Sequence, residues 1–194
     1  KKENGIIAAI LPLQNAKKHL AEVRATLLPA QGESLTVRMF GPYLEALLYL
    51  NQHFSKLLPT ERLRVLELIQ HEQWEGRALS PSETVESVQN PFTELGDFLV
   101  TLHLVPGQFI VYPLFSFQHR QELIFTYPGH RKKLQNFLRN TAGRYHAHKK
   151  KPKDSFHPEL RPLIYHYLKT RLAEKGPQYF VMQGKDLAQN YSKT

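Results

Sequence analysis

Apolar residues recur at helical spacing through most of the N-terminal half of the chain. This spacing predicts a first helix over residues 5–28. A second helix should follow Gly41-Pro42 and end at Pro59, because proline cannot continue a helix from its interior. A third should begin at Thr60, a residue type that suits the N-cap. The apolar faces would contain Leu44, Leu47, Leu48, Phe54 and Leu58 in the second helix, and Leu63, Leu66 and Ile69 in the third.

Two shorter elements are predicted in the same half. Residues 34–40 (SLTVRMF) alternate between polar and apolar side chains and include β-branched ones, which favours a short strand. Residues 80–83 (SPSE) place serine, proline and glutamate at the cap, first and third positions of a helix start. They predict a short helix that ends near Asn90-Pro91.

The pattern changes in the middle of the chain, where aromatic and β-branched residues gather in short runs. Residues 98–104, 108–117 and 122–127 are such runs, separated by turn formers such as Pro106-Gly107. They predict an antiparallel β-meander. Pro113 should place its strand at an edge or in a bulge, because proline cannot donate a ladder hydrogen bond. The first run also fits helical spacing, and this alternative stays open.

Two helices and a strand are predicted after the meander. Residues 130–146 have an amphipathic pattern, and residues 158–175 have the clearest helical pattern, with Gly176-Pro177 as a stop signal. Residues 178–183 (QYFVMQ) suit a final strand. The apolar face of the first of these helices would contain Leu134, Phe137, Leu138, Thr141 and Tyr145.

These elements indicate an α+β fold, with helical N- and C-terminal parts around a small antiparallel β-meander. We expect one domain over residues 1–184. It would comprise N-terminal helices within residues 5–90, the meander at about 98–127, and a basic helical part at 130–184. Residues 185–194 look like a polar tail.

Charge is distributed unevenly along the 194 residues, whose formal net charge is +9. Residues 1–100 carry 10 lysines and arginines against 12 acidic residues, whereas residues 101–194 carry 16 against 5. The densest basic segment contains nine cations and no carboxylate, which predicts an anionic partner, although a solvated surface without a partner is the alternative. Its members, our candidate partner-binding residues, are Arg131, Lys132, Lys133, Arg139, Arg144, Lys149, Lys150, Lys151 and Lys153.

Several kinds of site are absent from the sequence. The chain has no cysteine, which excludes disulfides, thiol nucleophiles and cysteine-ligated metals and fits a reducing, cytoplasmic compartment. It has no P-loop or Rossmann glycine motif and no serine nucleophile elbow. Glu67, His71 and Glu75 share a predicted helix face, which we interpret as solvated. We therefore expect no enzyme activity, no cofactor and no metal, and no apolar stretch is long enough to span a bilayer.

Residues 139–146 read Arg-Asn-Thr-Ala-Gly-Arg-Tyr-His. This segment resembles the Arg-Asn…His signature of the HEPN ribonucleases, which act without metal. The resemblance implies that His146 exchanges a proton with the ribose 2′-hydroxyl and that Arg139 steadies the phosphate. It also implies a helical bundle, which the β-rich middle of this chain does not suit. A metal-independent ribonuclease is therefore the second alternative function.

His146-Ala147-His148 resembles the metal-binding histidine pair of the HUH relaxases and replication initiators. That resemblance implies a tyrosine nucleophile on a helix, a role that Tyr165 or Tyr167 would take. The family places its histidine pair on a strand, whereas here the pair is predicted at the end of a helix.

The leading hypothesis is a non-catalytic adaptor or binding subunit of a larger assembly, whose basic C-terminal half docks an acidic protein surface or a nucleic acid. The first alternative is a nucleic-acid-binding protein that contacts phosphates through residues 131–153, with Tyr145 available for base stacking. The adaptor ranks ahead because no recognised nucleic-acid-reading motif accompanies the basic segment. That segment has no Trp, Phe or Leu on its polar side, so we do not expect it to insert into a membrane.

Overall fold

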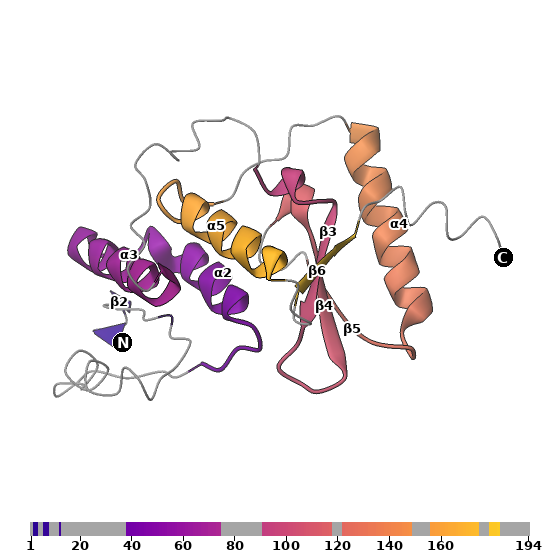
Figure 1. Cartoon of the computed structure of the whole chain (residues 1–194), viewed down its shortest axis with the longest axis horizontal. Coiled ribbons are helices and arrows are strands. Elements are labelled where there is room, and N and C mark those ends of the chain that lie inside the picture. The colour runs from indigo at the N-terminus through magenta and orange to yellow at the C-terminus, as the bar shows by residue number, and fades with distance from the viewer. Residues whose placement is uncertain are drawn as a thin grey trace.

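In a computed structural model, helices cover both faces of an antiparallel sheet (Figure 1). The described helices are α2 (Tyr43–Phe54), α3 (Pro59–Trp74), α4 (Arg131–His148) and α5 (Leu160–Ala173). Among them, α2, α3 and α5 lie on one side of the sheet and α4 lies on the other (Figure 1). The α+β fold expected from the sequence is confirmed. The structure describes residues 2–3, 6–7, 12, 38–74, 91–117, 122–148, 156–174 and 179–182.

The sheet combines the predicted meander with a strand from the C-terminal part. Its strands are β3 (Phe98–Leu102), β4 (Gln108–Pro113), β5 (Leu123–Thr126) and β6 (Tyr179–Met182), in the order β5-β4-β3-β6. Two short 3-10 turns, η2 (Pro91–Glu94) and η3 (Leu114–Ser116), precede β3 and follow β4. Strand β6 pairs with β3 and forms the edge of the sheet opposite β5. The chain therefore adds this edge strand only after α4 and α5.

Successive residues of the inner strands are buried against opposite faces of the sheet, and each face contributes to a different apolar core. The larger core, with α2, α3 and α5, contains Leu99, Ile110, Tyr112 and Tyr179. The smaller core, under α4, contains Phe98, Val100, Val111 and Phe125. Burial on both faces explains why apolar residues stand at successive strand positions, rather than at every second one.

Aromatic rings dominate the larger core. Phe92 of η2 is fully buried, and its ring centroid lies 5.0 Å from that of Phe117 and 4.8 Å from that of Phe156. The hydroxyls of Tyr167 and Tyr179 are 2.9 Å apart and share a hydrogen bond. These contacts join α5 and the segment before it to the sheet.

The N-terminal segment differs from the predicted helix over residues 5–28. Ile6–Ile7 form a short strand, β2, that pairs antiparallel with β1 (Lys2–Glu3), and Pro12 lies outside any helix. The sequence between the strands is Asn4-Gly5, which favours a two-residue hairpin turn, and this local preference outweighs the helical spacing. The remainder of that helix, the predicted helix at 81–90 and the tail at 185–194 lie outside the described residues.

Two predictions about α2 and α3 are also wrong. Helix α2 ends at Phe54, and Pro59 is the first residue of α3, a position where a helix needs no N–H from proline. Leu58 therefore lies in the connection, and it is exposed. Leu63 is exposed as well, because α3 turns the face with Val65 and Ile69 toward the core.

Further corrections concern two predicted strands. Residues 38–40 are irregular rather than extended in a strand, and residues 34–37 lie outside the described part of the chain. Strand β4 is an inner strand, and Pro113 is its last residue, so proline marks the strand end and not an edge or a bulge. The first run of the meander, which also fitted helical spacing, is a strand.

Candidate anion-binding surface

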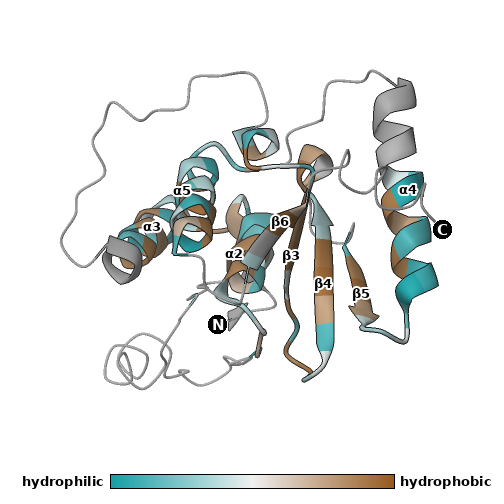
Figure 2. Ribbon diagram, turned by 45° about the vertical axis from the view of Figure 1, so that its right-hand side comes forward, coloured by the Kyte–Doolittle hydropathy of each residue, from teal (hydrophilic) through white to brown (hydrophobic). Residues whose placement is uncertain are grey.

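Helix α4 packs on the sheet through one narrow apolar stripe. Leu138 is buried, and Leu134 and Phe137 pack partly buried against the smaller core. Their spacing of three and four residues places them on one helix face. Figure 2 shows this hydrophobic side of α4 turned toward the sheet and a hydrophilic side turned outward. The predicted apolar face is confirmed at these three positions, whereas the side chain of Tyr145 is not described.

The described cations of α4 are exposed. Arg131, Lys132, Lys133 and Arg139 all face solvent. Lys132 and Arg139 are seven residues apart, so they lie on one line along the helix, opposite the apolar stripe. Helix α4 contains no acidic residue, and no ion pair joins these four cations to another residue in the described part of the chain.

The positive charges in the first turn of α4 do not stabilise the helix. The macrodipole favours acidic side chains at a helix start by roughly 0.3–1 kcal/mol each, and it opposes cations there. Arg131, Lys132 and Lys133 occupy this turn without a carboxylate beside them in the sequence. An anion bound at this surface would relieve both the mutual repulsion and the unfavourable interaction with the helix.

The other predicted binding residues extend along the same part of the chain. Arg144 lies on α4, where the structure describes the backbone but not this side chain. The four remaining lysines lie outside the described residues: Lys149, Lys150, Lys151 and Lys153. The structure thus leaves four of the nine candidates exposed on one helix, with Lys132 and Arg139 aligned on its outer face and Arg131 and Lys133 on its two flanks.

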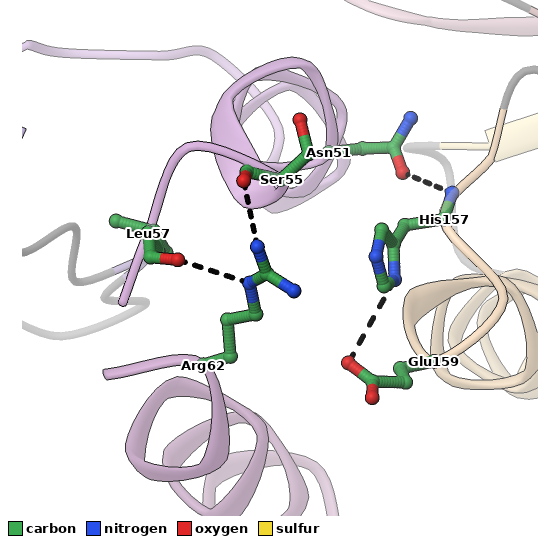
Figure 3. A network of polar contacts seen from close by, with 6 residues as sticks. All are labelled: Asn51, Ser55, Leu57, Arg62, His157 and Glu159. Carbon is green, nitrogen blue, oxygen red and sulfur yellow. Dashed lines mark hydrogen bonds and ion pairs between the residues drawn. The ribbon is translucent and has the colours of Figure 1, made fainter. Parts of the chain in front are cut away.

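A second polar cluster joins the ends of α2, α3 and α5 (Figure 3). Arg62 donates from Nε to the carbonyl of Leu57 at 3.0 Å and from Nη2 to the carbonyl of Ser55 at 2.6 Å. Its guanidinium carbon also lies 5.9 Å from the ring centroid of Phe54. Arg62 therefore satisfies carbonyls that the end of α2 leaves without helical partners.

His157 completes this cluster from the segment before α5. Its backbone N–H donates to the side-chain oxygen of Asn51 at 2.8 Å, and its ring packs edge-on against Phe54 with centroids 4.7 Å apart. Its Nδ1 lies 3.7 Å from a carboxylate oxygen of Glu159, which is too long for a hydrogen bond but close enough for an ion pair with a protonated imidazole (Figure 3).

We interpret Asn51, Arg62 and His157 as a helix clamp, the name used below for these three residues. Each makes a contact that holds one helix end against another, and no group of three metal-ligating side chains occurs within the described residues. No sequence pattern predicted the clamp, because Asn51 and His157 are 106 positions apart and belong to no motif.

The Arg139 and His146 pair of one family resemblance and the His146 and His148 pair of the other fall on α4, whereas Tyr165 and Tyr167 lie on α5. Arg139 is exposed, and His146 follows two turns later, with only its backbone described. The four-stranded sheet does not fit the helical bundle that the HEPN resemblance implies. His146 and His148 lie in a helix, not on a strand as the HUH resemblance requires.

Comparison of the chain with protein-family models, curated proteins and solved structures finds no match. Within the residues that the structure describes, none of the helices combines the length and apolar character needed to cross a membrane. The packing and charge of α4 are therefore the features of this molecule that bear on its function.

Proposed function

We propose that this chain is a non-catalytic adaptor or binding subunit that docks an anionic partner through the outer face of α4. The observation that carries the proposal is the set of four exposed cations on a helix without an acidic residue. One apolar stripe holds that helix on the sheet, so its outer face adds nothing to the core and is available for contact.

An acidic protein surface is the partner that we favour. Complementary charge accelerates association and fixes the orientation of a complex, which suits a subunit of a larger assembly. No nucleic-acid-reading motif accompanies the cations, so nucleic acid ranks second. In that alternative, residues 131–153 contact phosphates and binding is driven by counterion release. A cysteine-free chain suits a reducing compartment, and we propose that the protein acts in the cytoplasm.

Affinity capture from the native source tests this proposal when it is combined with a matched control. The test variant is Lys132→Glu/Lys133→Glu on α4. The control is Lys56→Glu/Lys169→Glu, which changes the net charge equally at two exposed lysines on the other side of the sheet. Both variants should fold, because exposed charges contribute only about ±0.5 kcal/mol each.

We expect the α4 variant to lose partners that the wild type and the control retain. Partners that survive nuclease treatment indicate an acidic protein, and partners that vanish with it indicate nucleic acid. Equal capture by all three proteins would contradict a docking role for α4.

A further inference from the structure

Exposed apolar side chains gather at one end of the sheet, beside the start of α4. At this end the chain turns from β3 to β4 through residues 103–107. Among the described residues, eight large hydrophobic side chains are exposed, and two of these, Leu58 and Leu63, lie near the α2–α3 connection. Five of the eight belong to what we call the hairpin end: Met39, Leu102, Leu104, Val105 and Tyr127.

Backbone contacts place these five residues together. Gln108 pairs with Thr126, so Tyr127 continues from β5 beside the β3–β4 turn. On the other side, a Cβ added to Gly41 would lie 2.5 Å from the backbone nitrogen of Leu104. The segment that contains Met39 therefore runs directly against the turn. Figure 2 shows the β3–β4 hairpin projecting beyond the ends of α2 and α4.

Cations lie beside the hairpin end, and few carboxylates lie near it. The N–H of Arg131 donates to the carbonyl of Pro128, so the cationic first turn of α4 begins immediately after Tyr127 and the tight turn that follows it. From residue 101 to residue 133 the sequence contains one acidic residue, Glu122, which precedes the opposite end of β5. Glu45 lies nearer, but its carboxylate accepts the N–H of Gly41.

We infer that the hairpin end docks on an anionic lipid bilayer. Leu104 and Val105 enter the boundary of the acyl chains, while Tyr127 and the cations of α4 lie at the level of the headgroups. Exposed aliphatic side chains on a projecting hairpin fit a deformable apolar medium. Phosphates offer no apolar surface to aliphatic side chains, and an acidic protein would need a preformed apolar pocket. This inference goes beyond the proposed function, because a membrane surface is not the partner named there.

The hairpin end supplies the exposed apolar side chains that the outer face of α4 lacks. The outer face of α4 carries charge without large apolar side chains, so the helix alone would bind headgroups but would not insert. The fold places the two features side by side although they stand about 25 residues apart in the sequence. Surface attraction and shallow insertion together give stronger binding than either gives alone.

Vesicle flotation of the full chain tests the inference. Wild type should float with vesicles of phosphatidylcholine containing about a quarter phosphatidylserine, and not with pure phosphatidylcholine. Leu104→Ser/Val105→Ser should weaken that binding at least about tenfold, and Lys132→Glu/Lys133→Glu should do the same. The matched control is Leu58→Ser/Leu63→Ser, which removes two apolar side chains elsewhere that are more exposed than Leu104 and Val105, and it should bind like the wild type.

A site-specific label reports insertion directly. Because the chain has no cysteine, Val105→Cys and Leu63→Cys each provide one attachment point for a polarity-sensitive fluorophore. With the anionic vesicles, emission from position 105 should shift to the blue, and emission from position 63 should not change. No shift at 105 in vesicle-bound protein would contradict insertion.

The outcome separates this inference from the proposed function. The Leu104→Ser/Val105→Ser variant should retain the partners that the wild type captures, because it leaves the cations of α4 intact. Failure of the wild type to bind anionic vesicles overturns the membrane inference and leaves the proposed function standing. Loss of a captured protein or nucleic acid in the serine variant would instead assign the hairpin to that interface, and it would equally overturn the inference.

Discussion

Both faces of the sheet bury apolar strand residues, but different helices cover the two faces. Helices α2, α3 and α5 cover one face with a deep aromatic and leucine-rich core. On the other face, α4 is the helix that the structure describes, and it contacts the sheet through three apolar side chains. The first face gives stability, whereas the second leaves a helix side free to carry charge.

The largest expected effect is on the α2–α3–α5 side. Phe92→Ala removes a fully buried ring that lies against the rings of Phe117, Phe156 and Tyr165. Truncating a buried phenylalanine costs about 3–5 kcal/mol, a large part of the stability of an ordinary domain. Chemical denaturation should show a much lower midpoint or loss of the cooperative transition.

Leu138→Ala is the corresponding change on the α4 side. Its cost should fall toward the lower end of the range of about 2–5 kcal/mol, because a helix held by few neighbours can settle into the space. The same denaturation measurement applies. A loss of stability equal to that of Phe92→Ala would show that the two sides of the sheet contribute equally to stability.

Arg62→Met tests whether polar contacts, like apolar ones, contribute more stability on the α2–α3–α5 side than on the α4 side. The change keeps the aliphatic stem but removes a charged donor from two carbonyls, which should cost about 1.5–3 kcal/mol. Arg139→Met removes an equally long cation from the outer face of α4 and should stay within about 0.5 kcal/mol of the wild type. If the two changes cost the same, Arg62 does not act as a clamp.

Alkaline pH should weaken the α2–α3–α5 side, because burial raises the pKa of both Tyr112 and Tyr179 above the ordinary value of 10.0. In the folded chain these hydroxyls keep protons that the unfolded chain releases, so the free energy of unfolding falls as pH rises above that value. Denaturation from about pH 9 to about pH 11 measures this slope. Tyr179→Phe should make it shallower, and an unchanged slope would mean that other groups cause the loss.

Local sequence patterns predicted elements better than the contacts between them. The stripe with Leu134 and Leu138 and the cations opposite it follow from helical spacing, and the meander follows from its turns and β-branched runs. The prediction for α3 was right at Leu66 and Ile69 but wrong at Leu63, because apolar residues at both Leu63 and Val65 permit two slightly different inward faces.

Long-range contacts could not be predicted in the same way. The pairing of β6 with β3, the helix clamp and the hairpin end all depend on residues that are far apart in the sequence. Hydrophobic periodicity determines which side of an element faces inward, but it carries no information about which other element lies there.

The smallest effect on stability, and the largest on binding, should come from Lys132→Glu/Lys133→Glu. Acidic residues at a helix start interact favourably with the macrodipole, so the variant should be as stable as the wild type or slightly more stable. Fluorescence anisotropy with a labelled polyglutamate peptide and a labelled single-stranded oligonucleotide would then measure binding alone. Lys56→Glu/Lys169→Glu provides the same change of net charge as a control.

That measurement most directly tests whether the cations of α4, rather than the net charge of the whole chain, form the proposed anion-binding site. We expect the α4 variant to weaken binding of at least one probe by at least about tenfold and to reduce its salt dependence by about two cations. The control should stay within about twofold of the wild type. Equal weakening by both variants would contradict the account, because the overall positive charge would then explain binding without α4.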